Sequence, residues 1–146
     1  MSKTAISETE VRQFIDDWFA RLDKHASVEE FLLMVADENL VMKFPEVTAY
    51  GHQGFIEWYE RVIKRYFDEV HTIKALEITP SNNMTKVKMI LQWQTSIWKA
   101  PDARSQRLDF YAAQTWELQR SPTTQKLMII TYNVGYFIPV EESDNL

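Results

Sequence analysis

The sequence contains no cysteine and only three glycines. Without cysteine the chain cannot form disulfides, thiolate metal sites or a cysteine nucleophile, and this composition is typical of a reducing compartment. We therefore expect a cytoplasmic protein. The sequence also lacks a glycine-rich phosphate loop, a P-loop and a G-x-S-x-G motif, so it gives no support to nucleotide binding.

Positive charge and long apolar runs are also scarce. The 16 Lys and Arg residues are outnumbered by 21 Asp and Glu residues, which gives a formal charge of −5. Because no basic cluster offsets this charge, we expect no binding to nucleic acid or to an anionic membrane. No apolar run approaches the roughly 18 residues of a membrane helix, and the N-terminal MSKTAISETE has no apolar signal core.

Aromatic residues, by contrast, are abundant. The chain has five Trp, six Tyr and eight Phe, or 13% of its 146 residues. Large rings suit a deep core, a ligand pocket or a subunit interface. At this length we expect residues 1–146 to form one domain with a sizeable core.

The first half of the sequence predicts three amphipathic helices and one short strand. Ser7 with Glu10 forms a capping box before an apolar stripe at helical spacing, and Ser27 with Glu30 repeats this signature before a short second helix. A third helix follows Gly51. Between the second and third helices, Leu40 to Phe44 is apolar enough for a strand, which Pro45 closes.

The second half predicts four long strands, joined by turns rich in Pro, Asn and Ser. They are Val70 to Thr79, Thr85 to Lys99, Arg104 to Arg120 and Lys126 to Ile138. Helices that precede a long antiparallel sheet indicate an α+β domain with the helices on one face. A curved sheet around helices leaves a cone, which can hold a small molecule.

The last of these strands is apolar on both faces, whereas a sheet with one wetted face alternates between apolar and polar residues. We expect a second copy of the chain to cover the outer face as a homodimer. The residues predicted to form this interface are Trp98, Ile130, Tyr132 and Tyr136.

The order of elements resembles the nuclear transport factor 2-like superfamily, from about Ser7 to Ile138. Local cues are Ala36-Asp37-Glu38 before the first strand, Gly51 before Phe55-Ile56-Glu57-Trp58-Tyr59, and Tyr136-Phe137 in the last strand. The resemblance implies a cystatin-like cone, or α+β barrel, with three N-terminal helices packed on a strongly curved mixed or antiparallel sheet. This superfamily includes SnoaL-like cyclases and scytalone dehydratase, and also binding and assembly domains.

Ketosteroid isomerase is another member, and its mechanism requires a carboxylate base, a tyrosine and a protonated aspartate. A hand alignment places these positions on Phe44, Trp18 and Gln114. A phenylalanine cannot accept a proton, and an indole is a poor substitute for a phenol. Isomerase chemistry of that type is therefore not expected.

His71 is the first candidate for a catalytic residue. It opens the second predicted strand, where SnoaL-like and dehydratase-like relatives often carry a pocket histidine, and imidazole exchanges protons near neutral pH. The carboxylate that orients it could be Asp16, Asp17 or Asp37. The alternative is a structural histidine at a strand end. Asp16 flanks the apolar stripe of the first helix and is the second catalytic candidate, unless it is simply solvated.

Polar and aromatic residues of the predicted core could bind a ligand. Gln114 and Asn133 fall in phase with apolar residues on their strands, so each either anchors a ligand or bridges neighbouring strands. The aromatic candidates could line a cavity or form plain core. They are Trp18, Phe44, Tyr59, Trp93, Trp116 and Phe137.

The three histidines share no metal-ligand spacing and HExxH is absent, so we expect neither a metal nor a cofactor. The sequence favours a cofactor-independent isomerase, cyclase or dehydratase that acts by proton transfer on a small apolar carbonyl compound. The alternative is a non-catalytic ligand-binding or protein-association domain.

Overall fold

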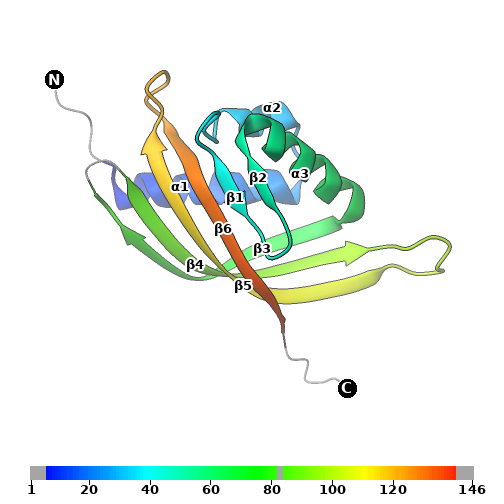
Figure 1. The fold of residues 1–146 in the computed structure, drawn as a ribbon. Coiled ribbons are helices and arrows are strands. Elements are labelled where there is room, and N and C mark those ends of the chain that lie inside the picture. Colours follow the sequence, from blue (N-terminus) through cyan, green and yellow to red (C-terminus); the bar gives the residue numbers. More distant parts are fainter. Residues whose placement is uncertain (1–5, 82–83, 141–146) are drawn as a thin grey trace.

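The computed structural model describes residues 6–81 and 84–140 (Figure 1). Three helices and six strands follow one another in this part of the chain. Their order is α1 (Glu8–Asp23), α2 (Val28–Leu32), β1 (Val41–Lys43), β2 (Thr48–Tyr50), α3 (Gly51–Arg65), β3 (Phe67–Thr79), β4 (Thr85–Ile97), β5 (Gln106–Arg120) and β6 (Leu127–Pro139).

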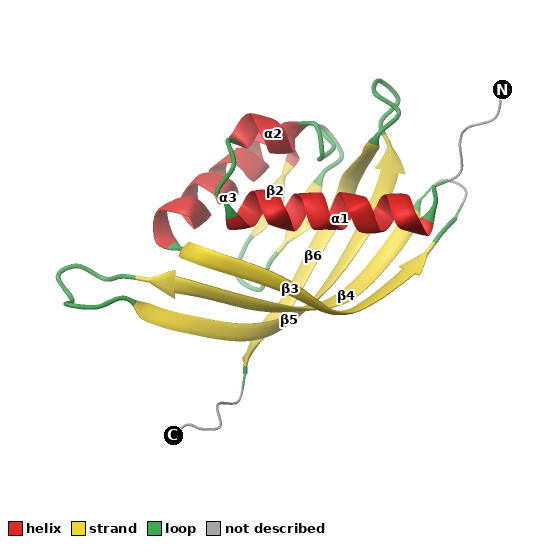
Figure 2. Ribbon diagram, turned by 180° about the vertical axis from the view of Figure 1, so that it is seen from behind, coloured by secondary structure: helices red, strands yellow, loops and turns green. Residues whose placement is uncertain are grey.

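The six strands form one mixed sheet in the order β2-β1-β6-β5-β4-β3. Neighbouring strands are antiparallel, except that β1 runs parallel to β6. The sheet curves strongly, and α1 and α3 lie on its concave side (Figures 1 and 2). The prediction of a cystatin-like α+β cone with N-terminal helices on a curved sheet is therefore confirmed.

Of the two capping boxes predicted from the sequence, only the first is confirmed. Ser7 caps α1 and accepts a hydrogen bond from the backbone N–H of Glu10 at 3.1 Å. Ser27 precedes α2 but makes no side-chain cap hydrogen bond, so the second capping box does not form. The helix is only five residues long, and Val35, three residues beyond its end, forms a parallel bridge with Ile129.

Two bulges in β6 change which of its residues face inward. The pairing with β5 skips Ile130 at one point and slips again between Val134 and Phe137. Each extra residue reverses the alternation of faces. Tyr132 is therefore buried at 2% exposure, and its predicted place on the outer face is wrong. Asn133 lies between the buried Tyr132 and Val134 in the strand and faces away from the concave side.

The core gathers around Trp18, which is fully buried on α1. Its ring lies against Phe31 and Phe55 from the other two helices and against Trp116 and Tyr132 from the sheet, with centroid distances of 5.1 to 6.0 Å. One residue thus joins all three helices to the sheet. Within the described residues, no helix is long and apolar enough to cross a membrane.

The convex face of the sheet carries exposed apolar side chains, among them Ile90, Tyr136 and Ile138. Trp98, just beyond β4, is also half exposed. The homodimer stays a prediction, and sedimentation at micromolar concentration is expected to give twice the 17.3 kDa chain mass. Tyr136→Glu should shift the mass toward the monomer because it places a charge in the apolar interface.

The matched control for that variant is Leu33→Glu, since Leu33 is similarly exposed but lies next to α2, away from the sheet face. Leu33→Glu should keep the dimer. A wild-type chain that sediments at 17.3 kDa would disprove the predicted interface.

Candidate active site

A cavity of about 530 Å³ lies between the helices and the concave face of the sheet. Its wall is largely aromatic and aliphatic, with a few polar groups, which is the usual composition of a small-molecule site. The aromatic lining consists of Phe44, Trp58, Tyr66, Trp93, Tyr132 and Phe137. The polar lining consists of Glu46, Arg61, Arg65, Glu69, His71 and Gln114.

Five of the residues suggested by the sequence line this cavity, and five others do not. The lining ones are Phe44, His71, Trp93, Gln114 and Phe137. Trp18, Tyr59 and Trp116 are buried in the core, and Asn133 faces the opposite side of the sheet. Asp16 is exposed on α1 and does not contribute to the lining, so the helix carboxylate near the cavity is a different one.

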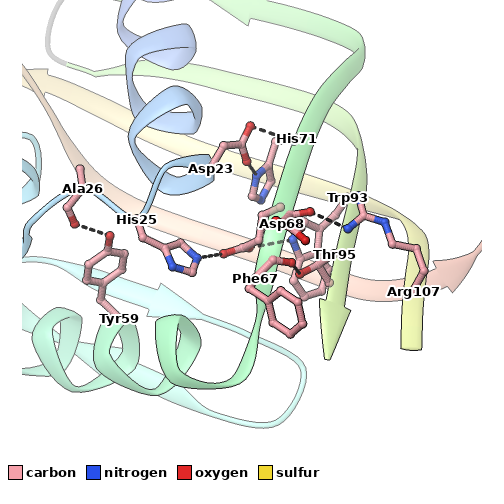
Figure 3. A network of polar contacts seen from close by, with 11 residues as sticks. Asp23, His25, Ala26, Tyr59, Phe67, Asp68, His71, Trp93, Thr95 and Arg107 are labelled. Atoms are coloured by element: carbon pink, nitrogen blue, oxygen red, sulfur yellow. Dashed lines mark hydrogen bonds and ion pairs between the residues drawn. The ribbon is translucent and has the colours of Figure 1, made fainter. Parts of the chain in front are cut away.

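Asp23, the last residue of α1, contacts His71 (Figure 3). Nδ1 of His71 lies 2.6 Å from Oδ1 of Asp23, and the backbone N–H of His71 donates to Oδ2 at 3.2 Å. The two oxygens of one carboxylate therefore hold both the ring and the backbone of His71. The His71 side chain is 10% exposed and that of Asp23 is 28% exposed.

Phe19 completes the support of His71. It lies four residues before Asp23, so both side chains leave the same face of α1. The Phe19 ring stacks on the imidazole with a centroid distance of 4.9 Å and an interplanar angle of 24°. The helix thus fixes the imidazole by a hydrogen bond at its edge and by an aromatic ring on its face.

This contact determines which nitrogen of His71 can react. A carboxylate only accepts hydrogen bonds, so Nδ1–H donates to Asp23 and the lone pair of the neutral ring is on Nε2. No hydrogen-bond partner of Nε2 occurs within residues 6–81 and 84–140. Because His71 lines the cavity, Nε2 is available to a molecule bound there.

Asp23 is not among the three carboxylates that the sequence suggested as partners of His71, which were Asp16, Asp17 and Asp37. The signal that could have found it is electrostatic. The C-terminal end of a helix carries partial negative charge, so a carboxylate there is unfavourable unless another group compensates it. Asp23 occupies that position, and His71 is the compensating group.

Gln114 and Tyr132 add polar groups to the sheet side of the cavity. Oε1 of Gln114 accepts from Nε1 of Trp116 at 2.9 Å, and Nε1 of Trp18 donates to the Tyr132 hydroxyl at 3.4 Å. Burial raises the pKa of Tyr132, although hydrogen bonds from Trp18 and Gln114 oppose the shift. The phenol is therefore a neutral hydroxyl that can still donate.

Tyr59 is buried and does not line the cavity, and its hydroxyl makes a structural contact. Its hydroxyl donates to the backbone carbonyl of Ala26 at 2.5 Å, which ties α3 to the segment after α1. Burial, with smaller effects of Glu69 and Glu30, raises the pKa of Tyr59 to about 12. In the part of the chain that the structure describes, no group of three His, Cys, Asp or Glu side chains could hold a metal ion.

Neither a protein-family model nor a curated protein sequence matches this chain. Solved structures do. A nuclear transport factor 2-like superfamily protein from Salmonella enterica superposes with a TM-score of 0.69 at 14% identity, over 92% of each chain. The chain has the nuclear transport factor 2-like fold. The expected resemblance is thereby confirmed at the level of the fold.

Two further structures share this nuclear transport factor 2-like fold. Hexachlorocyclohexane dehydrochlorinase, LinA type 2, gives a TM-score of 0.73 at 14% identity, over 92% of this chain and 88% of that one. A protein with a cystatin-like fold from Nostoc punctiforme gives 0.68 at 14% identity, over 99% and 100%. At such identities the likeness concerns the fold alone, so the function has to be argued from the cavity.

Proposed function

We propose that the cavity binds a small, largely apolar carbonyl compound and that the Asp23–His71 pair transfers a proton on it, without a cofactor. The reaction class is isomerisation, cyclisation or dehydration. The observation that carries this proposal is the 2.6 Å contact between Nδ1 of His71 and Oδ1 of Asp23. This contact orients the imidazole ring and leaves its Nε2 available to a ligand in the largely apolar cavity.

The chemistry of the first step follows from this geometry. Nε2 of His71 takes a proton from the carbon next to the carbonyl group, and the C–H electron pair becomes the C=C bond of an enol or enolate. The carbonyl π electrons move to oxygen, where Tyr132 or Gln114 could donate a hydrogen bond. Asp23 keeps the ring oriented and stabilises the imidazolium that forms.

One of the structures with the same fold is called a dehydrochlorinase. This name denotes an elimination, in which a proton and a leaving group depart from neighbouring atoms, and it favours a proton-transfer reaction as the proposal for the cavity. The outer sheet face supports the second candidate, a protein-association domain, but that role does not account for a polar pair at the wall of an apolar cavity.

Binding of 2-tetralone, a bicyclic ketone, tests the cavity as a ligand site. We expect saturable quenching of tryptophan fluorescence, because Trp58 and Trp93 line the cavity. Ala112→Phe should weaken the affinity by about tenfold or more, since a ring added at this buried lining position fills the space of the ligand.

The matched control is Ala113→Phe, at the next residue of β5, which is exposed on the opposite face of the sheet. It should bind 2-tetralone as the wild type does. Equal affinities of all three proteins, or no binding by the wild type, would refute the proposal.

A further inference from the structure

A second carboxylate–imidazole pair lies beside the first. Nε2 of His25 lies 2.5 Å from Oε2 of Glu69, and Nε1 of Trp93 donates to Oε1 at 3.0 Å. The Glu69 side chain is 3% exposed and lines the cavity, two residues before His71 on β3. The proton transfer proposed above does not use this buried carboxyl group.

A β-bulge brings Glu69 to the concave side. The register of β3 against β4 shifts after Phe67, and Asp68 adopts a left-handed backbone with φ of 53°. Two hydrogen bonds hold this backbone, one from Thr95 Oγ1 to the Phe67 carbonyl at 3.2 Å and one from Arg107 Nη1 to the Asp68 carbonyl at 2.6 Å (Figure 3). Bulges of this kind redirect a side chain, often next to a functional site.

The partner of Glu69 is held in an unusual conformation as well. His25 lies just beyond α1 and has φ of 53°, a region that residues other than glycine rarely occupy. Residues in such conformations concentrate at ligand sites, where the surrounding structure holds them. The end of α1 and the start of β3 are thus joined by two parallel contacts, Asp23 to His71 and His25 to Glu69.

The chemistry of Glu69 indicates what it can bind. A carboxylate has about four acceptor sites, and His25 and Trp93 use two of them. The remaining sites accept a donor from the cavity. The charged residues of the lining balance one another, because Arg61 and Arg65 are matched by Glu46 and Glu69. The cavity therefore has no excess charge that attracts a cationic or an anionic ligand, and a neutral donor on an apolar molecule fits it.

We propose that Glu69 binds a hydroxyl group of the ligand, so that the cavity selects hydroxylated apolar compounds over their unsubstituted analogues. The inference rests on the proposed function for the cavity as the binding site, and it adds the substrate class. Because Glu69 and His71 are two residues apart on one strand, the bound hydroxyl lies on the same side of the ligand as the base.

The test compares 2-naphthol with naphthalene, which differ only by a hydroxyl group, in NMR titrations. The wild type should bind 2-naphthol about tenfold more tightly or better, the range expected for a hydrogen bond to a charged acceptor. Glu69→Gln should reduce this preference to below about threefold and leave the affinity for naphthalene unchanged. Glu77→Gln, at an exposed position of the same strand, is the matched control and should keep the full preference.

The outcomes separate this inference from the proposed function. If the wild type binds both probes equally, or if Glu69→Gln keeps the preference, Glu69 does not bind the hydroxyl group and the inference fails, while the cavity remains a ligand site. A preference that His71→Asn abolishes and Glu69→Gln retains would assign the hydroxyl to His71 instead. No binding of either probe would refute the inference, whereas the proposed function would fail only if 2-tetralone also did not bind.

A labelling experiment on the wild type decides the case if Glu69→Gln does not fold. With ¹³C in the glutamate carboxyl groups, the Glu69 resonance should move when 2-naphthol is added and stay nearly unchanged with naphthalene. Equal responses to the two probes would overturn the inference.

Discussion

Replacing His71 by Asn is expected to slow the exchange of the α-protons of 2-tetralone in deuterated water by about 10²-fold or more, relative to the wild type. Asparagine keeps the approximate size and polarity, and its amide can still contact Asp23. It has no group that accepts and releases a proton near neutral pH. NMR follows the loss of the α-proton signal, and circular dichroism checks that the variant is folded.

His52→Asn is the matched control. His52 is also half-buried and hydrogen-bonded, to the backbone carbonyl of Val35 at 3.1 Å, but it does not line the cavity. The exchange rate of this variant should equal that of the wild type. If His71→Asn exchanged the ketone as fast as the wild type does, His71 would have a structural role only, with a stability loss of roughly 0.5–1.5 kcal/mol for one hydrogen bond.

Trp18→Ala is expected to lower the free energy of unfolding by about 3–5 kcal/mol, the usual cost of removing a large aromatic side chain from a core. Trp18 is fully buried among rings from both other helices and from the sheet, so the cavity left behind has few ways to collapse. Urea denaturation followed by circular dichroism measures the change.

Leu33→Ala removes a large apolar side chain from an exposed site. Leu33 is 71% exposed and lies next to α2, away from the predicted dimer interface. We expect this control to lose about 1 kcal/mol or less. Similar losses in the two variants would contradict the central place of Trp18 in the core.

The fold could be predicted because its long elements leave clear local signals. The capping box at Ser7 and the four long strands with their turns determine the order of elements, and that order is typical of this fold. β2 was missed because three residues cannot display an alternating pattern. Strict alternation places Tyr132 on the wrong face of β6, since nothing in the sequence marks the bulge at Ile130.

Only those residues of the candidate site that break a local sequence pattern could be predicted from the sequence. His71 and Gln114 stand out as polar residues at the start or inside of apolar strands, and both line the cavity. Asp23 and Glu69 become informative only through their partners, 48 and 44 residues away in the sequence. Such long-range pairs depend on the bulge in β3 and on the path of the chain just after α1. Local sequence patterns reveal neither of them.

The most direct test of the central claim is the rate of α-proton exchange of 2-tetralone by the wild type, compared with free imidazole at the same concentration and with Ala112→Phe. We predict that the wild type exceeds free imidazole by about 10²-fold or more, because the cavity holds the α-carbon close to an oriented base. Ala112→Phe, which blocks the cavity, should lose most of this acceleration. A wild-type rate equal to that of free imidazole, or an acceleration that Ala112→Phe leaves intact, would contradict the claim.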